Sequence, residues 1–197
     1  MVDRRSERRT VTGESKDMVE MHRTPFDRGY VQVYTGDGKG KTTAAIGLAL
    51  RAAGAGLRVF IAQFVKSGRY SEIEALERFS DLIVCRQYGR GCWLRGKPSE
   101  DDKRVAREAL KELREIIQSG RYQLVILDEA NIATWFELFS VEELLGLIDL
   151  KPERVELVFT GRRADPRLIE RADLVTEMQE VKHYYQQDVL ARKGIES

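Results

Sequence analysis

Nine consecutive residues combine glycine, lysine and threonine at a spacing suited to phosphate chemistry: Thr35-Gly36-Asp37-Gly38-Lys39-Gly40-Lys41-Thr42-Thr43. Glycines allow a loop to adopt positive φ and let its backbone N–H groups approach an anion closely. Where such a loop opens a helix, the helix N-terminus adds partial positive charge to the same concavity. Lys41 supplies a cation for the outer phosphates, and the Thr42 hydroxyl is suited to ligate Mg²⁺. The stretch therefore predicts a phosphate-binding loop (P-loop) that holds a nucleoside triphosphate.

The predicted loop departs from the usual pattern at its first glycine. In the pattern G-x-x-x-x-G-K-[ST], counting back from Gly40 places Thr35 at the first glycine position, and Gly36 follows one residue late. We therefore expect an unusual loop shape, in which the nucleotide does not lie as it does in ordinary ATPases and GTPases.

A second candidate is the acidic pair Asp128-Glu129, which follows the apolar run from Leu124 to Leu127. An acidic residue at the end of such a strand can hold Mg²⁺ beside the P-loop threonine. Many strands end in acidic turns, so the pair alone is weak evidence. About ninety residues after a P-loop it is stronger, and it predicts a metal site built from Thr42, Asp128 and Glu129.

The remaining candidates each have an ordinary structural alternative. Arg51, in the predicted P-loop helix, either reaches a phosphate tail or faces solvent. Gln63 and Lys66 are candidate nucleotide or substrate contacts, although a solvated Lys66 is equally compatible with the sequence. His183 is the more interesting of two histidines, but a lone histidine is more often a structural group. Trp93 stands in a glycine-rich loop, where a large ring tends to cover either the core or a ligand.

These residues need a scaffold, and from Tyr30 onward apolar runs of strand length alternate with helical runs. Continuous apolar strands between helices predict a single-domain α/β fold of the P-loop NTPase (RecA-like) type, with three layers and a mainly parallel sheet. Ligands collect at the carboxyl ends of such strands. The predicted strands are 30–34, 58–64, 82–86, 123–127, 155–160 and 173–176, and the predicted helices are 42–53, 70–79, 99–120, 140–148 and a short one from 165.

Composition limits the other classes of protein. The 197 residues, 42% hydrophobic and 33% charged, suit one soluble domain over residues 28–197 with a polar tail over residues 1–27. The tail either is mobile or orders over an active site. A net charge of +1 favours neither nucleic acid nor an acidic membrane surface. Two cysteines, and no apolar run near the ~20 residues of a membrane helix, predict a cytoplasmic protein without disulfides.

Together these motifs resemble the P-loop branch of the ATP:corrinoid adenosyltransferases, over nearly everything from Gly29 to Ser197. Asp37 and Asp188 are departures, because the family more often has Asn and Gly at these positions. The P-loop variant and the Val181-Lys-His183…Gly194-Ile-Glu196 tail are the specific signals. The other matching motifs are Gln63-Phe-Val-Lys66, the Gly89–Trp93 loop, Leu127-Asp-Glu129, Thr160-Gly-Arg162 and Ala172-Asp-Leu-Val-Thr-Glu-Met178.

The resemblance implies transfer of the 5′-deoxyadenosyl group of ATP to Co(I) of a reduced corrinoid, with triphosphate as the leaving group. It implies ATP and a corrinoid as substrates, Mg²⁺ or Mn²⁺ as cofactor, a flavoprotein-type reductant and a homodimer. It also implies that ATP runs in reverse through the loop, which would account for the displaced glycine. It assigns Trp93 and His183 to corrinoid binding, and Lys41, Thr42 and Glu129 to catalysis. The residues that it assigns to ATP binding are Gly36, Asp37, Gly38, Lys39, Gly40, Lys41, Thr42, Thr43 and Arg51.

Two other classes of function stay open from the residues alone. A P-loop phosphotransferase or ATPase would use Glu129, the only candidate base, and would release ADP. A nucleotide-dependent nucleic-acid-binding module would need a basic stripe with interleaved aromatic residues, and the sequence has none.

Overall fold

A computed structural model describes residues 26–68, 70–89 and 97–196 of the chain. Its centre is a six-stranded sheet in the order β3-β2-β4-β5-β1-β6, in which every pair is parallel. This confirms the predicted α/β fold. The strands are β1 (Val31–Thr35), β2 (Val59–Gln63), β3 (Ile83–Gln87), β4 (Leu124–Asp128), β5 (Glu156–Thr160) and β6 (Leu174–Glu177).

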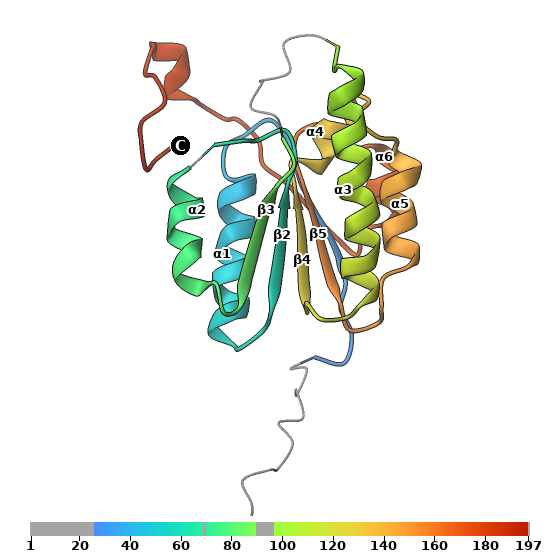
Figure 1. Cartoon of the computed structure of the whole chain (residues 1–197). Coiled ribbons are helices and arrows are strands. Elements are labelled where there is room, and N and C mark those ends of the chain that lie inside the picture. Colours follow the sequence, from blue (N-terminus) through green and yellow to red (C-terminus); the bar gives the residue numbers. More distant parts are fainter. Residues whose placement is uncertain (1–25, 69, 90–96, 197) are drawn as a thin grey trace, which may run out of the picture.

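Helices cover both faces of the sheet, which gives the three layers visible in Figure 1. The long amphipathic helix α3 and helix α5 lie on one face, and α1 and α2 lie on the other. The helices are α1 (Lys41–Gly54), α2 (Ser71–Leu76), α3 (Glu100–Gln118), α4 (Ala130–Trp135), α5 (Val141–Asp149) and α6 (Pro166–Arg171), with single 3₁₀ turns η1 (Glu77–Phe79) and η2 (Tyr184–Gln187).

The continuous apolar strands fill two cores because successive side chains point to opposite faces. In β4, Leu124 and Ile126 join the cluster under α1, whereas Val125 and Leu127 join the cluster under α3 and α5. Strand β2 divides in the same way, and all five of its residues are buried. A strand buried on both faces cannot be shifted in register without losing a core contact, so the strand ends are fixed relative to one another.

Two helix starts follow from local sequence. Ser99 caps α3 by accepting from the Asp102 N–H, and Ser140 caps α5 by accepting from the Glu143 N–H. In both, the acidic side chain accepts in return from the backbone N–H of the serine, which satisfies two helix donors that otherwise lack partners. Each of the two helices therefore begins with a capping box, and that of α3 uses Asp at its third helical position.

The predicted elements are all present, but the sequence did not indicate α4 or η2, and the predicted helix 70–79 is divided into α2 and η1. Of the predicted tail, only residues 26 and 27 lie within the described part of the chain. No helix of the described residues is long and apolar enough to cross a membrane.

Candidate active site

Several of the predicted site residues meet where the parallel strands end. Gln63, the last residue of β2, stands opposite Asp128, the last residue of β4. Thr160 ends the neighbouring strand β5, and the P-loop joins β1 to α1 on the same edge of the sheet. Four strands therefore deliver polar residues to one place, as expected for a ligand site in a parallel sheet.

Lys41, the first residue of α1, lies inside the P-loop and is only 7% exposed. Its ammonium group donates to the carbonyl oxygens of Gly36 and Gly38, each at 2.7 Å. Burial is the main cause that lowers the Lys41 pKa, and the nearby Arg162 guanidinium lowers it further. A triphosphate in the loop would favour the charged form of this lysine, so the site is prepared for an anion.

The Asp128 carboxylate is the centre of a closed hydrogen-bond network. Its Oδ1 accepts from the Thr42 hydroxyl at 2.9 Å and from the Thr160 hydroxyl at 2.7 Å. Its Oδ2 accepts from the Gln63 amide at 3.1 Å and from the Lys66 ammonium at 3.0 Å. Asp128 is 1% exposed, and burying a polar group is costly unless it is hydrogen-bonded, as it is here. The P-loop threonine and the acidic strand end thus contact each other directly.

Lys66 connects the same two groups from the solvent side. Besides its ion pair with Asp128, its ammonium donates to the Thr42 hydroxyl oxygen at 3.2 Å. Burial lowers the Lys66 pKa, but the attraction and hydrogen bond of Asp128 outweigh it, so the pKa stands above its ordinary value. Lys66 is therefore a charged member of the site, and the alternative of a freely solvated side chain is wrong.

Glu129 begins α4 with a left-handed backbone, at φ 61°. Its N–H donates to the Thr160 hydroxyl at 3.0 Å. Burial is the main cause that raises the pKa of its carboxyl group, and the Asp128 charge raises it further. Together with Asp128 and the Thr42 hydroxyl, it makes up the set of oxygen groups predicted for the metal site.

These oxygens fit Mg²⁺, although the described residues include no group of three or more His, Cys, Asp or Glu placed to hold a metal. Mg²⁺ is commonly held by one or two protein carboxylates, with substrate phosphates and water completing its shell. The Lys66 ammonium already lies between Thr42 and Asp128, so the position accepts a cation. The residues fit a metal that arrives with a triphosphate.

Two P-loop glycines have a structural purpose that the sequence did not reveal. A Cβ on Gly36 would lie 2.4 Å from the Met178 carbonyl oxygen, and one on Gly38 would lie 2.7 Å from the same atom. The Gly38 N–H donates to that oxygen at 2.6 Å. The predicted positive φ is present at Gly36 and Gly40, at 89° and 121°. The loop is therefore glycine-rich partly because the chain after β6 packs against it.

The other P-loop side chains point outward. Lys39 donates to the Ile195 carbonyl oxygen at 2.8 Å and pairs with Glu196 at 3.3 Å, which ties the loop to the C-terminal segment. Asp37 faces Arg162 at 3.9 Å, with 75% of its side chain exposed, and Thr43 is exposed. These contacts bring the P-loop, Arg162 and the chain near Glu196 close to one another.

Comparison with known proteins agrees with this arrangement. A model of the family described as ATP:corrinoid adenosyltransferase BtuR/CobO/CobP matches residues 27–197. The chain belongs to this family. The predicted resemblance is therefore confirmed over the whole α/β domain, including the P-loop and the acidic strand end.

Named relatives support the same assignment. A corrinoid adenosyltransferase of Pseudomonas aeruginosa is 35% identical over 171 residues, which cover 86% of this chain and 84% of the relative. One from a Sinorhizobium species is 36% identical over 173 residues, covering 86% and 81%. One from Escherichia coli K12 is 29% identical over 196 residues, covering both chains fully.

Three predicted family residues lie away from the metal-site network or outside the described chain. Arg51 is exposed in the last turn of α1, about 15 Å along the helix axis from Lys41 at 1.5 Å per residue. His183 begins η2, where its Nδ1 accepts from the Tyr185 N–H at 3.0 Å. Trp93 lies outside the described residues. Their roles in binding ATP and the corrinoid stay predictions.

Asp188, one of the two expected departures from the family pattern, has a left-handed backbone conformation. Asp188 ends η2 in the left-handed region, at φ 59°. Glycine adopts this conformation freely, and Asp tolerates it better than most residues. An Asp at this position, where we expected glycine in the family, is therefore compatible with the turn.

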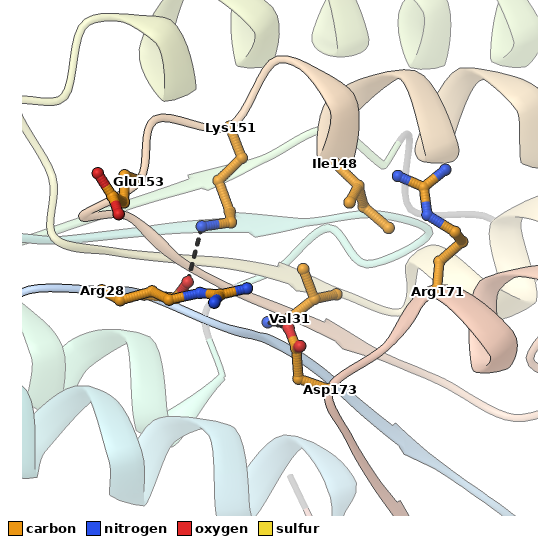
Figure 2. A pocket seen from close by; sticks show the side chains of 8 residues that line it. Arg28, Val31, Ile148, Lys151, Glu153, Arg171 and Asp173 are labelled. Atoms are coloured by element: carbon orange, nitrogen blue, oxygen red, sulfur yellow. Dashed lines mark hydrogen bonds between the residues drawn. The ribbon is translucent and has the colours of Figure 1, made fainter.

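A further hollow lies at the opposite edge of the sheet, where β1, β5 and β6 begin. Its lining includes Arg28, Lys151, Arg171 and Asp173, as Figure 2 shows. The Lys151 ammonium donates to the Gly29 carbonyl oxygen at 2.8 Å, and the Asp173 carboxylate accepts from the Val31 N–H. These charged groups hold the start of β1 in place, far from the P-loop, and we assign the hollow a structural role.

Proposed function

We propose that this protein transfers the 5′-deoxyadenosyl group of ATP to the cobalt of a reduced corrinoid and releases triphosphate. Family membership supports ATP and a corrinoid as the substrates. In the proposed step Co(I) donates an electron pair to the ribose C5′. A cobalt–carbon bond forms, the C5′–O bond breaks, and its electron pair leaves on the triphosphate. Cobalt becomes formally Co(III), so the step needs no other oxidant.

The observation that carries this proposal is the collection of positive groups at the P-loop. Displacement at C5′ makes the whole triphosphate a leaving group, and donors placed along it stabilise the charge that develops. Lys41 lies inside the loop, Lys66 lies at its mouth, and Arg162 lies within electrostatic reach of Lys41. Co(I) is already strongly nucleophilic, so no protein base is required.

A divalent metal belongs to the same proposal. Thr42 and Asp128, with Glu129 beside them, would hold Mg²⁺ or Mn²⁺, which when bound would neutralise charge on the leaving triphosphate. The Thr42 hydroxyl donates its hydrogen bond to Asp128 Oδ1, which orients the hydroxyl lone pairs away from that carboxylate. Thr160 and Gln63 hold the carboxylate in its plane from the buried side.

The deciding experiment mixes the protein with Mg-ATP and chemically reduced corrinoid. The cobalt–carbon product should form, as followed by absorbance, together with an equal amount of triphosphate. Lys41→Ala should abolish both products because the leaving group loses its buried cation. Lys151→Ala, at the opposite edge of the sheet, is the matched control and should retain activity. Release of ADP and phosphate would instead favour a phosphotransferase, and corrinoid product without triphosphate would overturn the mechanism.

Trp93 remains the candidate for displacing the lower axial ligand of Co(II) corrinoids before reduction. Trp93→Ala should slow product formation from Co(II)alamin plus reductant, while the reaction from chemically prepared Co(I) should change less. Equal rates for the variant and the native protein in both reactions would exclude this role.

We also propose a homodimer served by a flavoprotein-type reductant. Large apolar side chains that a dimer interface would cover are exposed on β6 and the segment after it, namely Leu174, Val175, Val181, Tyr185, Leu190 and Ile195. Sedimentation should give twice the mass of one chain, and a monomer at micromolar concentration would exclude the dimer.

A further inference from the structure

The Asp128 carboxylate has no vacant acceptor position in the structure. A carboxylate has two oxygens with about four acceptor sites, and four donors occupy them: the Thr42 and Thr160 hydroxyls, the Gln63 amide and the Lys66 ammonium. The Thr42 oxygen, in turn, accepts from Lys66. A metal ion can therefore contact Thr42 and Asp128 directly only if one of these donors leaves.

Lys66 is the donor that can leave. Gln63 and Thr160 are both fully buried, and Gln63 is held further by the Gln87 amide at 3.0 Å. The Lys66 side chain is 21% exposed, has a flexible stem, and is the only cation among the four donors. It approaches Asp128 and Thr42 together, so a cation that replaced it would gain both oxygens at once.

The backbone is bent against its preference to place Lys66 there. Val65 has φ 64°, a region in which a β-branched residue is an outlier. The Lys66 N–H donates to the Phe64 carbonyl oxygen at 2.7 Å, which makes Val65 the centre of a γ-turn of the rare positive-φ type. Gly89 packs on this turn so closely that a Cβ would lie 2.4 Å from the Lys66 carbonyl oxygen. Such strain persists where surrounding structure enforces it, and it clusters at functional sites.

We infer that Lys66 is a displaceable placeholder for the divalent metal of the P-loop. In the nucleotide-free protein its ammonium occupies the position between Thr42 and Asp128, so free metal binds weakly. Metal that arrives with triphosphate brings additional ligands and displaces the ammonium. Lys66 is thus a positioning residue that couples metal entry to nucleotide entry. The inference rests on the proposed metal site but not on the adenosyl transfer.

The test is metal affinity in the absence of ATP and corrinoid, with Mn²⁺ as a paramagnetic probe. Lys66→Met removes the charge that repels a metal ion and frees the acceptor positions, so Mn²⁺ should bind at least about tenfold more tightly than to the native protein. With a chelator present, Lys66→Met should unfold at a lower temperature than the native protein, because Asp128 loses its counter-ion. Mn²⁺ should then raise the thermal midpoint of the variant far more than that of the native protein.

Three variants keep this result interpretable. Lys66→Arg retains a cation and should keep Mn²⁺ binding weak. Adding Asp128→Asn to Lys66→Met should remove the gained affinity, which locates the ion. Lys151→Met removes another half-buried lysine, shown in Figure 2, and should leave Mn²⁺ binding unchanged.

Unchanged Mn²⁺ affinity in Lys66→Met, with a lowered midpoint that Mn²⁺ does not restore, would overturn the inference and leave Lys66 a purely structural counter-ion. Because no corrinoid or nucleotide is present, failure of adenosyl transfer would not produce that outcome. Conversely, if adenosyl transfer fails but Lys66→Met binds Mn²⁺ more tightly, the proposed reaction is refuted and the inference about Lys66 still holds.

Discussion

Thr160 is the residue on which the orientation of the acidic strand end depends. Its hydroxyl donates to Asp128 and accepts from the Glu129 N–H, and the residue is completely buried. Thr160→Val keeps the shape but leaves both partners short of a hydrogen bond, which costs about 1–3 kcal/mol for a buried group. Urea denaturation should show this loss of unfolding free energy. A loss below about 0.5 kcal/mol would mean that water replaces the hydroxyl.

Glu129 predicts a pH dependence of stability with a definite sign. Burial and the Asp128 charge raise its pKa above the ordinary value of 4.5, so the folded protein holds this proton more tightly than the unfolded chain. The resulting stabilisation is complete below pH 4.5 and is lost as pH rises through the folded-state pKa. Metal-free Glu129→Gln should therefore unfold at a higher temperature than the native protein at pH 8, and the gap should close as pH falls toward 4.5. A variant less stable than the native protein at pH 8 would contradict this.

At this scale the sequence predicted some partners and missed others. Lys41, Thr42 and Asp128 could be identified because their spacing and strand context are local signals. Lys66 and Gln63 were suggested only as nucleotide or substrate contacts. The sequence of neither β2 nor β4 shows that these two strands are neighbours, so the contact with Asp128 could not be predicted. Thr160 was placed at the right edge without a role, because a threonine that ends a strand has no distinctive local pattern.

The P-loop as an element depends on its glycines for packing as well as for phosphate binding. Gly38→Ala should loosen the C-terminal segment, because the added Cβ would lie 2.7–2.8 Å from backbone atoms of Met178 and Gln179. Hydrogen exchange at the Gly38 and Met178 amides should accelerate, and the free energy of unfolding should fall.

Gly47→Ala is the matched control within the next element. Gly47 lies in the middle of α1 with nothing within 4 Å of the added Cβ. Alanine there should stabilise the protein by about 0.5–1 kcal/mol, because glycine loses more conformational entropy in a helix. If Gly38→Ala and Gly47→Ala changed the free energy of unfolding in the same direction, the packing explanation for Gly38 would fail.

Elements with strong periodicity were predictable, whereas the short helix α4 was not. Helix α3 has nineteen residues, an apolar stripe and a capping box, each readable from sequence. Helix α4 has only six residues and follows Glu129, which is left-handed and makes no side-chain cap. Its existence depends on packing against β5, which is a tertiary effect.

For the whole molecule, the fold should not depend on residues before 26. Among the described residues, every strand lies between Val31 and Glu177, and Val31 is the first residue of either core. A chain starting at Phe26 should therefore keep the thermal midpoint of the full chain within experimental error. Limited proteolysis of the full chain with and without both substrates tests whether the same residues cover an active site. A large drop in the midpoint would show that they form part of the core.

The order of the sheet could not be derived from the sequence, because no strand carries a local signal that names its neighbours. The predicted alternation of strands and helices fits several parallel orders. The actual order places β1 between β5 and β6, through backbone pairing to residues more than a hundred positions later.

That placement has a consequence for synthesis of the chain on the ribosome. Strand β1 leaves the ribosome first, yet its neighbours are the last two strands to be made, in the register Val31 to Leu157 and Gln32 to Leu174. The P-loop therefore cannot assemble until nearly the whole domain has emerged, and until then Val31 and Val33 have no strand partner. Pairings this distant in sequence also slow folding. Nascent chains halted before residue 156 should be digested by protease whether or not ATP is present, and protection should appear only in longer chains.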